Sequence, residues 1–161
     1  MESKSAETVV LGLGNVLHAD DGVGVQVVRR LREDARVPGD VSLIEGGTLG
    51  LELLSYVPEC SHLIVIDAVE IGRAPGTVVL MSRDEVNALP GQSSVHQLGL
   101  GDLLVALKIL AQKRPEVVLV GVQPASMEWS TELSPPVAAA MDLLVDAAIE
   151  ELCRKPEKSA A

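Results

Sequence analysis

Short apolar runs alternate with amphipathic segments along almost the whole chain. The runs are continuous and rich in Val, Leu and Ile, which is typical of strands buried on both faces of a sheet. The predicted strands are Thr8–Leu13, Val41–Glu45, His62–Val69, Thr77–Met81 and Glu116–Val122. The run at His62–Val69 is the most apolar, so we expect it near the centre of the sheet.

Helical periodicity fills the segments between these runs. Apolar residues recur every fourth position in a segment from about Gly22 to Arg32, which predicts a helix with one buried face. A capping-box pattern, Ser94-x-x-Gln97, marks the start of a helix within Ser93–Gln112. Its predicted buried stripe is Leu100, Leu103, Leu104 and Leu107. Further helices are predicted at Leu49–Ser55 and Pro135–Cys153.

Strands that alternate with helices predict an α/β fold, here a three-layer α/β/α sandwich with a mostly parallel, mixed five-stranded sheet. The turn at Pro75-Gly76 should return Thr77–Met81 as an antiparallel neighbour of the preceding strand. No repeat or linker divides the chain, so residues 1–161 are expected to form one domain with an ordered core of about 8–153. The charged tail Arg154–Ala161 is predicted to be disordered.

Composition narrows the classes of function. A net charge of -10 without a basic stripe argues against nucleic acid as a partner. Cys60 and Cys153 stand far apart without metal-ligand spacing, which indicates reduced, structural thiols. The polar start Met1–Glu7 lacks the features of a signal peptide, and no apolar run approaches the roughly 20 residues that cross a bilayer. We therefore expect a cytoplasmic protein without a membrane segment.

Acidic residues gather where the first three predicted strands end. Asp20 and Asp21 follow the first strand, Glu45 ends the second and Asp67 lies near the end of the third. His96 shares a helix face with the leucine stripe, so it should point toward the same edge of the sheet. Such nitrogen and oxygen ligands suit nickel, zinc or iron. The alternative is structural: a helix cap at Asp20 or Asp21, a loop-amide acceptor at Asp67 and a core histidine at His96.

The remaining sequence motifs are weaker indicators of function than this group of acidic residues and His96. Gly12-x-Gly14 begins a dinucleotide-binding fingerprint, but Leu17 stands where the third glycine belongs, so a nucleotide-binding domain is only a rival interpretation. No GxSxG elbow is present. His62 should be structural, at the opposite end of the sheet, and His18 a solvated loop residue that could touch substrate. Trp129 either contacts a protein partner or anchors its loop, beside the solvated Glu128 and Glu132.

Five ordered sequence blocks together resemble the nickel-iron hydrogenase maturation endopeptidases. The resemblance is collinear from Thr8 to Cys153. The blocks are GLGNVLHADDGVG from Gly12, EGGTLGLELL from Glu45, LIVIDAV from Leu63, HQLGLGDLL from His96 and LVGVQP from Leu119. This resemblance implies a peptidase that removes a C-terminal extension from the hydrogenase large-subunit precursor after nickel has been inserted.

The resemblance also implies site residues. The family's catalytic and metal-contacting triad falls on Asp21, Asp67 and His96, and the nickel is carried by the precursor, although other divalent metals are expected to occupy the site in vitro. Some members have Glu where Asp21 stands, and Asp where Glu45 stands. The segment Glu45, Gly46, Gly47 and Thr48 is a candidate for binding the substrate peptide, or else a simple strand-to-helix turn.

Two aspects of the function stay open at the level of sequence. Cleavage could use a carboxylate as general base or a metal that polarises the scissile carbonyl. The rival function is a non-cutting, nickel-sensing chaperone that binds the precursor. A monomer is the expected state of an enzyme that must dock on a large protein.

Overall fold

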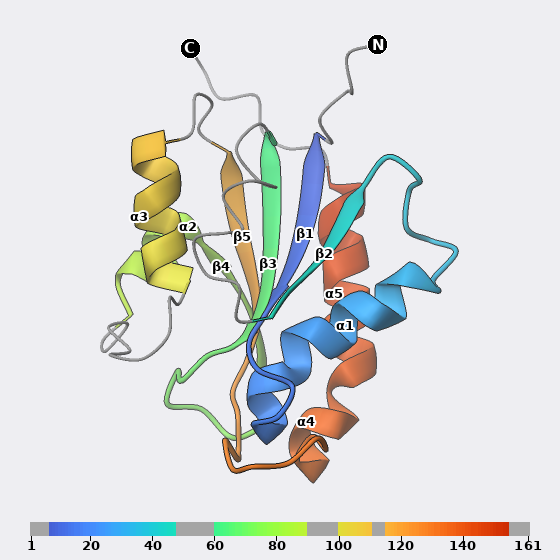
Figure 1. Ribbon diagram of the computed structural model, residues 1–161, viewed down its shortest axis with the longest axis vertical. Coiled ribbons are helices and arrows are strands. Elements are labelled where there is room, and N and C mark those ends of the chain that lie inside the picture. Colours follow the sequence, from blue (N-terminus) through green and yellow to red (C-terminus); the bar gives the residue numbers. More distant parts are fainter. Residues whose placement is uncertain (1–6, 48–59, 90–99, 111–114, 155–161) are drawn as a thin grey trace.

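The computed structural model describes residues 7–47, 60–89, 100–110 and 115–154, and its elements alternate as the apolar pattern predicts (Figure 1). The strands are β1 (Thr8–Leu13), β2 (Ser42–Gly47), β3 (His62–Ala68), β4 (Val78–Ser82) and β5 (Glu116–Val122). The helices are the 3-10 turn η1 (Ala19–Gly22), α1 (Val23–Arg32), α2 (Arg83–Asn87), α3 (Leu100–Leu110), α4 (Pro135–Ala139) and α5 (Met141–Cys153).

The strands form one sheet in the order β2-β1-β3-β5-β4. β1 pairs in parallel with β2 and β3, β3 pairs in parallel with β5, and β4 is antiparallel to β5. The mixed five-stranded sheet and the central place of β3 are therefore confirmed. The expected partner of β4 was wrong: both edges of β3 are occupied by β1 and β5, so β4 takes the free edge of β5.

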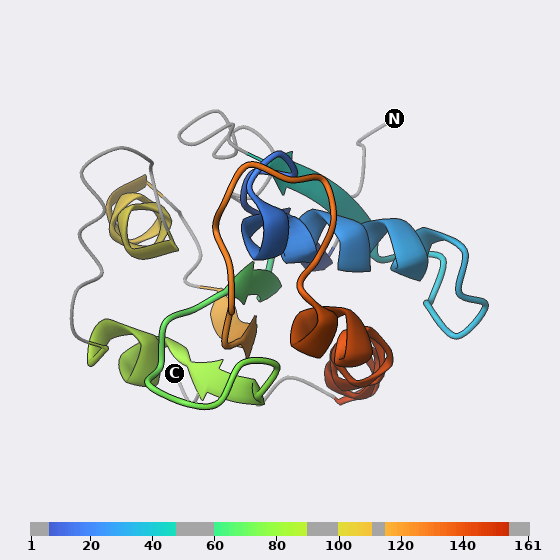
Figure 2. The same ribbon diagram turned by 90° about the horizontal axis from the view of Figure 1, so that it is seen from below.

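Helices cover both faces of this sheet, which gives the predicted three layers (Figures 1 and 2). Side chains alternate along each strand between two aliphatic clusters. One cluster joins the sheet to α2 and α3, and the predicted leucine stripe of α3 belongs to it, with exposures of 2% to 6%. The other cluster joins the opposite face to α1, α4 and α5.

The strand order creates a switch point between β1 and β3. The chain leaves β1 for α1 and β2 on one side, whereas the connection from β3 leads to β4 at the other edge. In open α/β sheets, ligands bind at the carboxyl ends of two strands that diverge in this way. This is the lower end of the sheet in Figure 1 and faces the viewer in Figure 2.

Two glycines allow α1 to lie directly against the sheet. A Cβ added to Gly12 would be 2.3 Å from the Gly24 carbonyl oxygen, and a Cβ added to Gly24 would be 2.2 Å from the carbonyl oxygen of Ile66. Gly14 meets backbone as well, so close packing accounts for Gly12 and Gly14 without a bound phosphate.

The other helices agree only in part with the helices predicted from the sequence. α2 was missed, although Ser82 caps it by accepting from the Glu85 amide, a signal present in the sequence. The last helix breaks at Ala140, whose amide bonds to Val137 three residues back. Arg154, the first residue of the tail, donates to Glu151 of α5, and the rest of the tail lies outside the described residues. The expected helix Leu49–Ser55 and the Ser94–Gln97 cap lie outside the described residues.

The described helices include none that is both long and apolar enough to pass through a bilayer. Of the two cysteines, Cys60 is buried and Cys153 exposed, and neither forms a disulfide.

A substitution at Gly24 tests the close contact between α1 and the sheet. Because the new Cβ would overlap backbone atoms of Ile66 and Leu13, Gly24→Ala should lower the free energy of unfolding by roughly 1–3 kcal/mol. Urea denaturation measures the change. Gly39→Ala is the matched control, since a Cβ there meets nothing within 4 Å, and an equal loss in both variants would contradict the packing argument.

Candidate active site

Asp21 is held at the carboxyl end of β1 by the loop that precedes it. Gly14 has φ +104°, and a Cβ on it would lie 1.7 Å from the Asp21 carbonyl oxygen, so only glycine fits this turn. The Gly14 amide donates to the Gly47 carbonyl of β2 at 3.1 Å. The Asn15 amide donates to Oδ2 of Asp21 at 2.9 Å. Both bonds fix the Asp21 carboxylate at the switch point.

Asp67 approaches the same place from β3. Its neighbour Ile66 packs in the core on the α1 side, so the partly buried Asp67 points to the opposite face of the sheet. Burial, and after it the negative charge of nearby Asp21, raise the pKa of Asp67 to about 8, although the Ala68 amide acts in the opposite direction. The structure thus brings Asp21 and Asp67 together.

The negative charge of Asp21 adds to the raised pKa of Asp67, so a proton on Asp67 or a bound cation would relieve the repulsion between the two carboxylates. Oxygen ligands that converge at the open end of a sheet offer such a cation part of its coordination. The third member of the predicted triad, His96, lies outside the described residues, as does Thr48.

Glu45 does not join this pair. β2 continues to Gly47, so Glu45 lies inside the strand and not at its end. Glu45 and Ile66 both pair with Gly12, which places the Glu45 side chain on the α1 face, opposite to Asp67. There Glu45 forms ion pairs with Arg32 and Arg29 of α1, which hold its pKa below the usual range.

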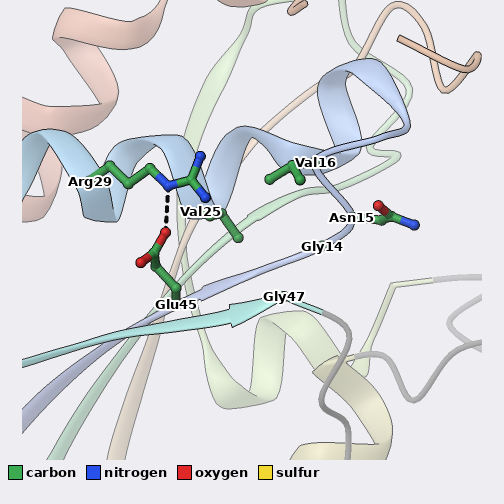
Figure 3. A pocket seen from close by; sticks show the side chains of 7 residues that line it. All are labelled: Gly14, Asn15, Val16, Val25, Arg29, Glu45 and Gly47. Carbon is green, nitrogen blue, oxygen red and sulfur yellow. Dashed lines mark hydrogen bonds and ion pairs between the residues drawn. The ribbon is translucent and has the colours of Figure 1, made fainter. Parts of the chain in front are cut away.

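A pocket of about 300 Å³ opens beside Glu45 and reaches the loop that carries Asp21 (Figure 3). Its lining combines the Arg29–Glu45 ion pair with the end of β2 and the start of the loop. The lining residues are Gly14, Asn15, Val16, Val25, Arg29, Glu45 and Gly47. The candidate substrate-binding residues Glu45 and Gly47 therefore lie on a pocket, whereas Gly46 is buried against Leu11.

Asp20 is a structural residue and not part of the acidic edge, contrary to expectation. Its side chain is 0% exposed and accepts from the amides of Ala125, Ser126 and Ser134 at 2.8–2.9 Å, and from the Ser134 hydroxyl at 2.8 Å. Neither aspartate caps α1, because its N-cap is Gly22 without a side-chain bond. Asp20 instead fastens the loop after β5 to η1, and Figure 2 shows this orange loop reaching the start of α1.

Gln123 has a similar role that sequence analysis did not detect. The side chain is 4% exposed, and its Oε1 accepts from the amides of Ile71 and Arg73 at 2.8 and 3.3 Å. Its Nε2 donates to Glu70 at 2.9 Å. Gln123 therefore fixes the loop after β3, the strand that carries Asp67. The available signal was a polar residue directly after a buried strand.

A further group with metal-ligand chemistry lies at the opposite end of the sheet. His62 is 1% exposed and its Nε2 donates to Glu151 at 3.2 Å, which agrees with its predicted structural role. Potential ligand atoms of His62, Glu116 and Glu151 lie within 4.8 Å of one another. The Arg154 guanidinium already bridges the two carboxylates, so we interpret this group as an ion-pair cluster that ties α5 to the sheet.

Comparison with known proteins identifies the family. The profile described as "HycI: Hydrogenase maturation protease" matches residues 25–151. The chain belongs to the hydrogenase maturation protease family. As a member it is a peptidase, with the five-stranded α/β fold of that family. Among the curated members, the hydrogenase 2 maturation protease of Escherichia coli is 38% identical over 146 residues, covering 89% of this chain and 87% of that protein.

Two further members extend the likeness. The hydrogenase expression/formation protein HupD of Rhodobacter capsulatus is 40% identical over 152 residues, covering 92% of this chain and 72% of that protein. The solved structure of the hydrogenase maturating endopeptidase HybD of E. coli superposes with a TM-score of 0.82 at 37% identity, covering 91% of this chain and 92% of the other. The protease fold therefore extends over nearly the whole chain.

Asp20→Asn tests how the loop after β5 is held. An amide group would face the Ala125 and Ser126 donors, so we expect a loss of roughly 1–3 kcal/mol in the free energy of unfolding at pH 7. Burial alone would raise the pKa of Asp20, but the hydrogen bonds from Ser126, Ser134 and Ala125 outweigh burial and lower it from 3.8.

The stability that Asp20 contributes depends on pH because its pKa is lowered in the folded state. The contribution of Asp20 is present above pH 3.8 and is lost as the pH falls through the lower pKa of the folded state. Urea denaturation at pH 7 and below pH 3 should therefore show the variant and the wild type converging at the acidic end. Asp40→Asn, at an exposed position, should have little effect at either pH. If the difference in unfolding free energy between Asp20→Asn and the wild type persisted unchanged in acid, that result would contradict the role of the ionised carboxylate.

Proposed function

We propose that this chain is the endopeptidase that removes the C-terminal extension of a nickel-iron hydrogenase large-subunit precursor after nickel insertion. The proposal is supported by the electrostatic interaction of Asp21 with Asp67 at the switch point of a sheet with the hydrogenase maturation protease fold. The curated relative in E. coli is named as the maturation protease of hydrogenase 2, which supports a hydrogenase as the substrate.

Nickel enters this proposal as cargo of the substrate. Asp21 and Asp67 supply carboxylate oxygens, and His96 would add an imidazole nitrogen, a donor set that suits a borderline divalent ion. So few protein ligands leave coordination positions for groups of the precursor. The mutual repulsion of Asp21 and Asp67 is relieved when a cation arrives, so the enzyme would bind a nickel-loaded precursor more tightly than an empty one.

The same carboxylates are candidates for the cleavage step. The pKa of Asp67 is about 8 without a metal, and a nickel ion that relieves the repulsion from Asp21 would lower that pKa and leave Asp67 ionised, as a general base must be. In the proposed step, Asp67 accepts a proton from the water that attacks the scissile carbonyl. Nickel bound beside it would add Lewis acidity toward that carbonyl oxygen. The pocket between α1 and the end of β2 includes Gly14 and Asn15 of the loop that leads to Asp21, and we propose that it receives part of the extended peptide.

A cleavage assay on purified precursor tests the function. Mass spectrometry should show that the wild type shortens the nickel-loaded precursor at its C-terminus and leaves the nickel-free precursor intact. Asp67→Asn and His96→Ala should lower the rate by about 100-fold or more, since each removes a proposed catalytic or nickel-contacting group. Asp142→Asn makes the same chemical change as Asp67→Asn on the exposed side of α5, where the side chain is 85% exposed, and should cleave like wild type.

Each alternative predicts a different result. Binding of the loaded precursor without shortening by the wild type would indicate a non-cutting chaperone. Equal cleavage of loaded and nickel-free precursor would refute the nickel dependence but not the peptidase activity. Full activity of Asp67→Asn would exclude the proposed role of that carboxylate.

A further inference from the structure

We propose that Leu17, Met127 and Trp129 form a docking patch for the folded body of the precursor, separate from the residues that hold the nickel and the scissile bond. The inference rests on the proposed function and adds the surface by which the substrate protein is recognised. These three side chains are 49%, 46% and 77% exposed. Burial of such apolar side chains against a partner is favourable, whereas their exposed surface does not stabilise the fold.

The docking patch is built from two loops that pair with each other. The Ser130 amide donates to the Leu17 carbonyl at 2.9 Å, and the Ala19 amide donates to the Ser130 carbonyl at 2.8 Å. His18 and Ser130 form a parallel bridge between the loops. Residues before η1 and residues after β5, far apart in sequence, are thereby joined into one surface.

His18 fixes the exposed indole. The rings of His18 and Trp129 lie 4.2 Å apart between centroids, at an interplanar angle of 40°. Nδ1 of His18 lies 3.2 Å from the Met127 carbonyl oxygen, to which it donates. An aromatic anchor that is already oriented loses less conformational entropy when a partner binds, and tryptophan is enriched among the residues that dominate binding energy.

The docking patch is linked rigidly to the candidate active site. Leu17 and His18 precede Asp21 in the same short loop, and the buried carboxylate of Asp20 holds the backbone of Ala125 and Ser126. A protein seated on Trp129 is therefore held in a fixed position relative to Asp21. Docking would bring its C-terminal segment to the carboxylates in one orientation, which is how proximity contributes to catalysis.

The charges around the docking patch define the chemistry of its partner. Glu128 and Glu132 flank Trp129 and are exposed. The chain has no Lys or Arg from Thr8 to Val28 or from Glu116 to Cys153, the two stretches that contain the patch loops. The complementary surface is an apolar hollow rimmed by Lys or Arg side chains. A second copy of this chain is a poor occupant, because two acidic rims would repel each other.

Trp129→Ala tests the docking patch. We expect the KM for the nickel-loaded precursor to rise about tenfold or more while kcat changes less than about twofold, since the variant loses docking contacts and keeps the catalytic carboxylates. Trp129→Phe should recover part of the affinity because it retains an aromatic ring. Leu143→Ala is the matched control: it removes a side chain that is 57% exposed on α5, and its KM should stay within about twofold of wild type.

A binding measurement separates this inference from the proposed function. Trp129 is the one tryptophan of the chain, so protein labelled with 5-fluorotryptophan gives a single fluorine NMR signal. That signal should shift when unlabelled precursor is added, whether or not cleavage follows. Normal cleavage by Trp129→Ala together with an unshifted signal would overturn the docking patch and leave the peptidase proposal intact.

Two other results would refute either both proposals or the precursor as the partner of the docking patch. A wild-type chain that neither binds nor cuts a loaded precursor would refute both proposals. A signal that shifts with the concentration of the labelled chain alone would assign the docking patch to self-association and refute the precursor as its occupant.

Discussion

The arrangement of the active end depends on one buried carboxylate. Asp20 accepts four hydrogen bonds from the loop after β5, and so fastens that loop to the segment between β1 and α1. Asp21 follows directly in the chain, and Leu17 and Trp129 lie on the two joined loops. An ionised group with all of its bonds satisfied inside the protein is costly to disturb. This constraint keeps Asp21, the carboxylate that we propose to contact nickel, at a constant distance from the proposed docking patch.

Adjacent aspartates thus perform opposite tasks. Asp20 is saturated with donors, which stabilises its charge, whereas Asp21 faces Asp67 and destabilises a second charge there. Ala19, directly before Asp20, adopts a left-handed φ of 49°, which is a strained conformation for a residue other than glycine. Asp21 and Asp67 repel each other, and we propose that the nickel of an incoming substrate relieves this repulsion. Asp20 thus holds the loops rigidly, and the next residue, Asp21, supplies the charge that acts on Asp67.

The sequence predicted the strands, the layers and the edge of the sheet where Asp21 and Asp67 meet, because apolar runs and strand ends are local features. It did not separate Asp20 from Asp21, since their environments depend on a loop more than a hundred residues away. It also placed Glu45 with the aspartates, because the face on which a strand residue points depends on register, which pairing sets and composition does not. His96 lies outside the described residues and stays a prediction.

We propose that Asp21 and Asp67 form the part of the site that contacts nickel. Titration of isotopically labelled protein with Ni²⁺, followed by amide NMR, tests it most directly, because a paramagnetic ion broadens the signals of nearby residues. We predict that broadening begins at Asn15, Asp21 and Ala68 and is lost in Asp67→Asn. Broadening centred instead on His62 and Glu151, or unchanged in Asp67→Asn, would contradict the account.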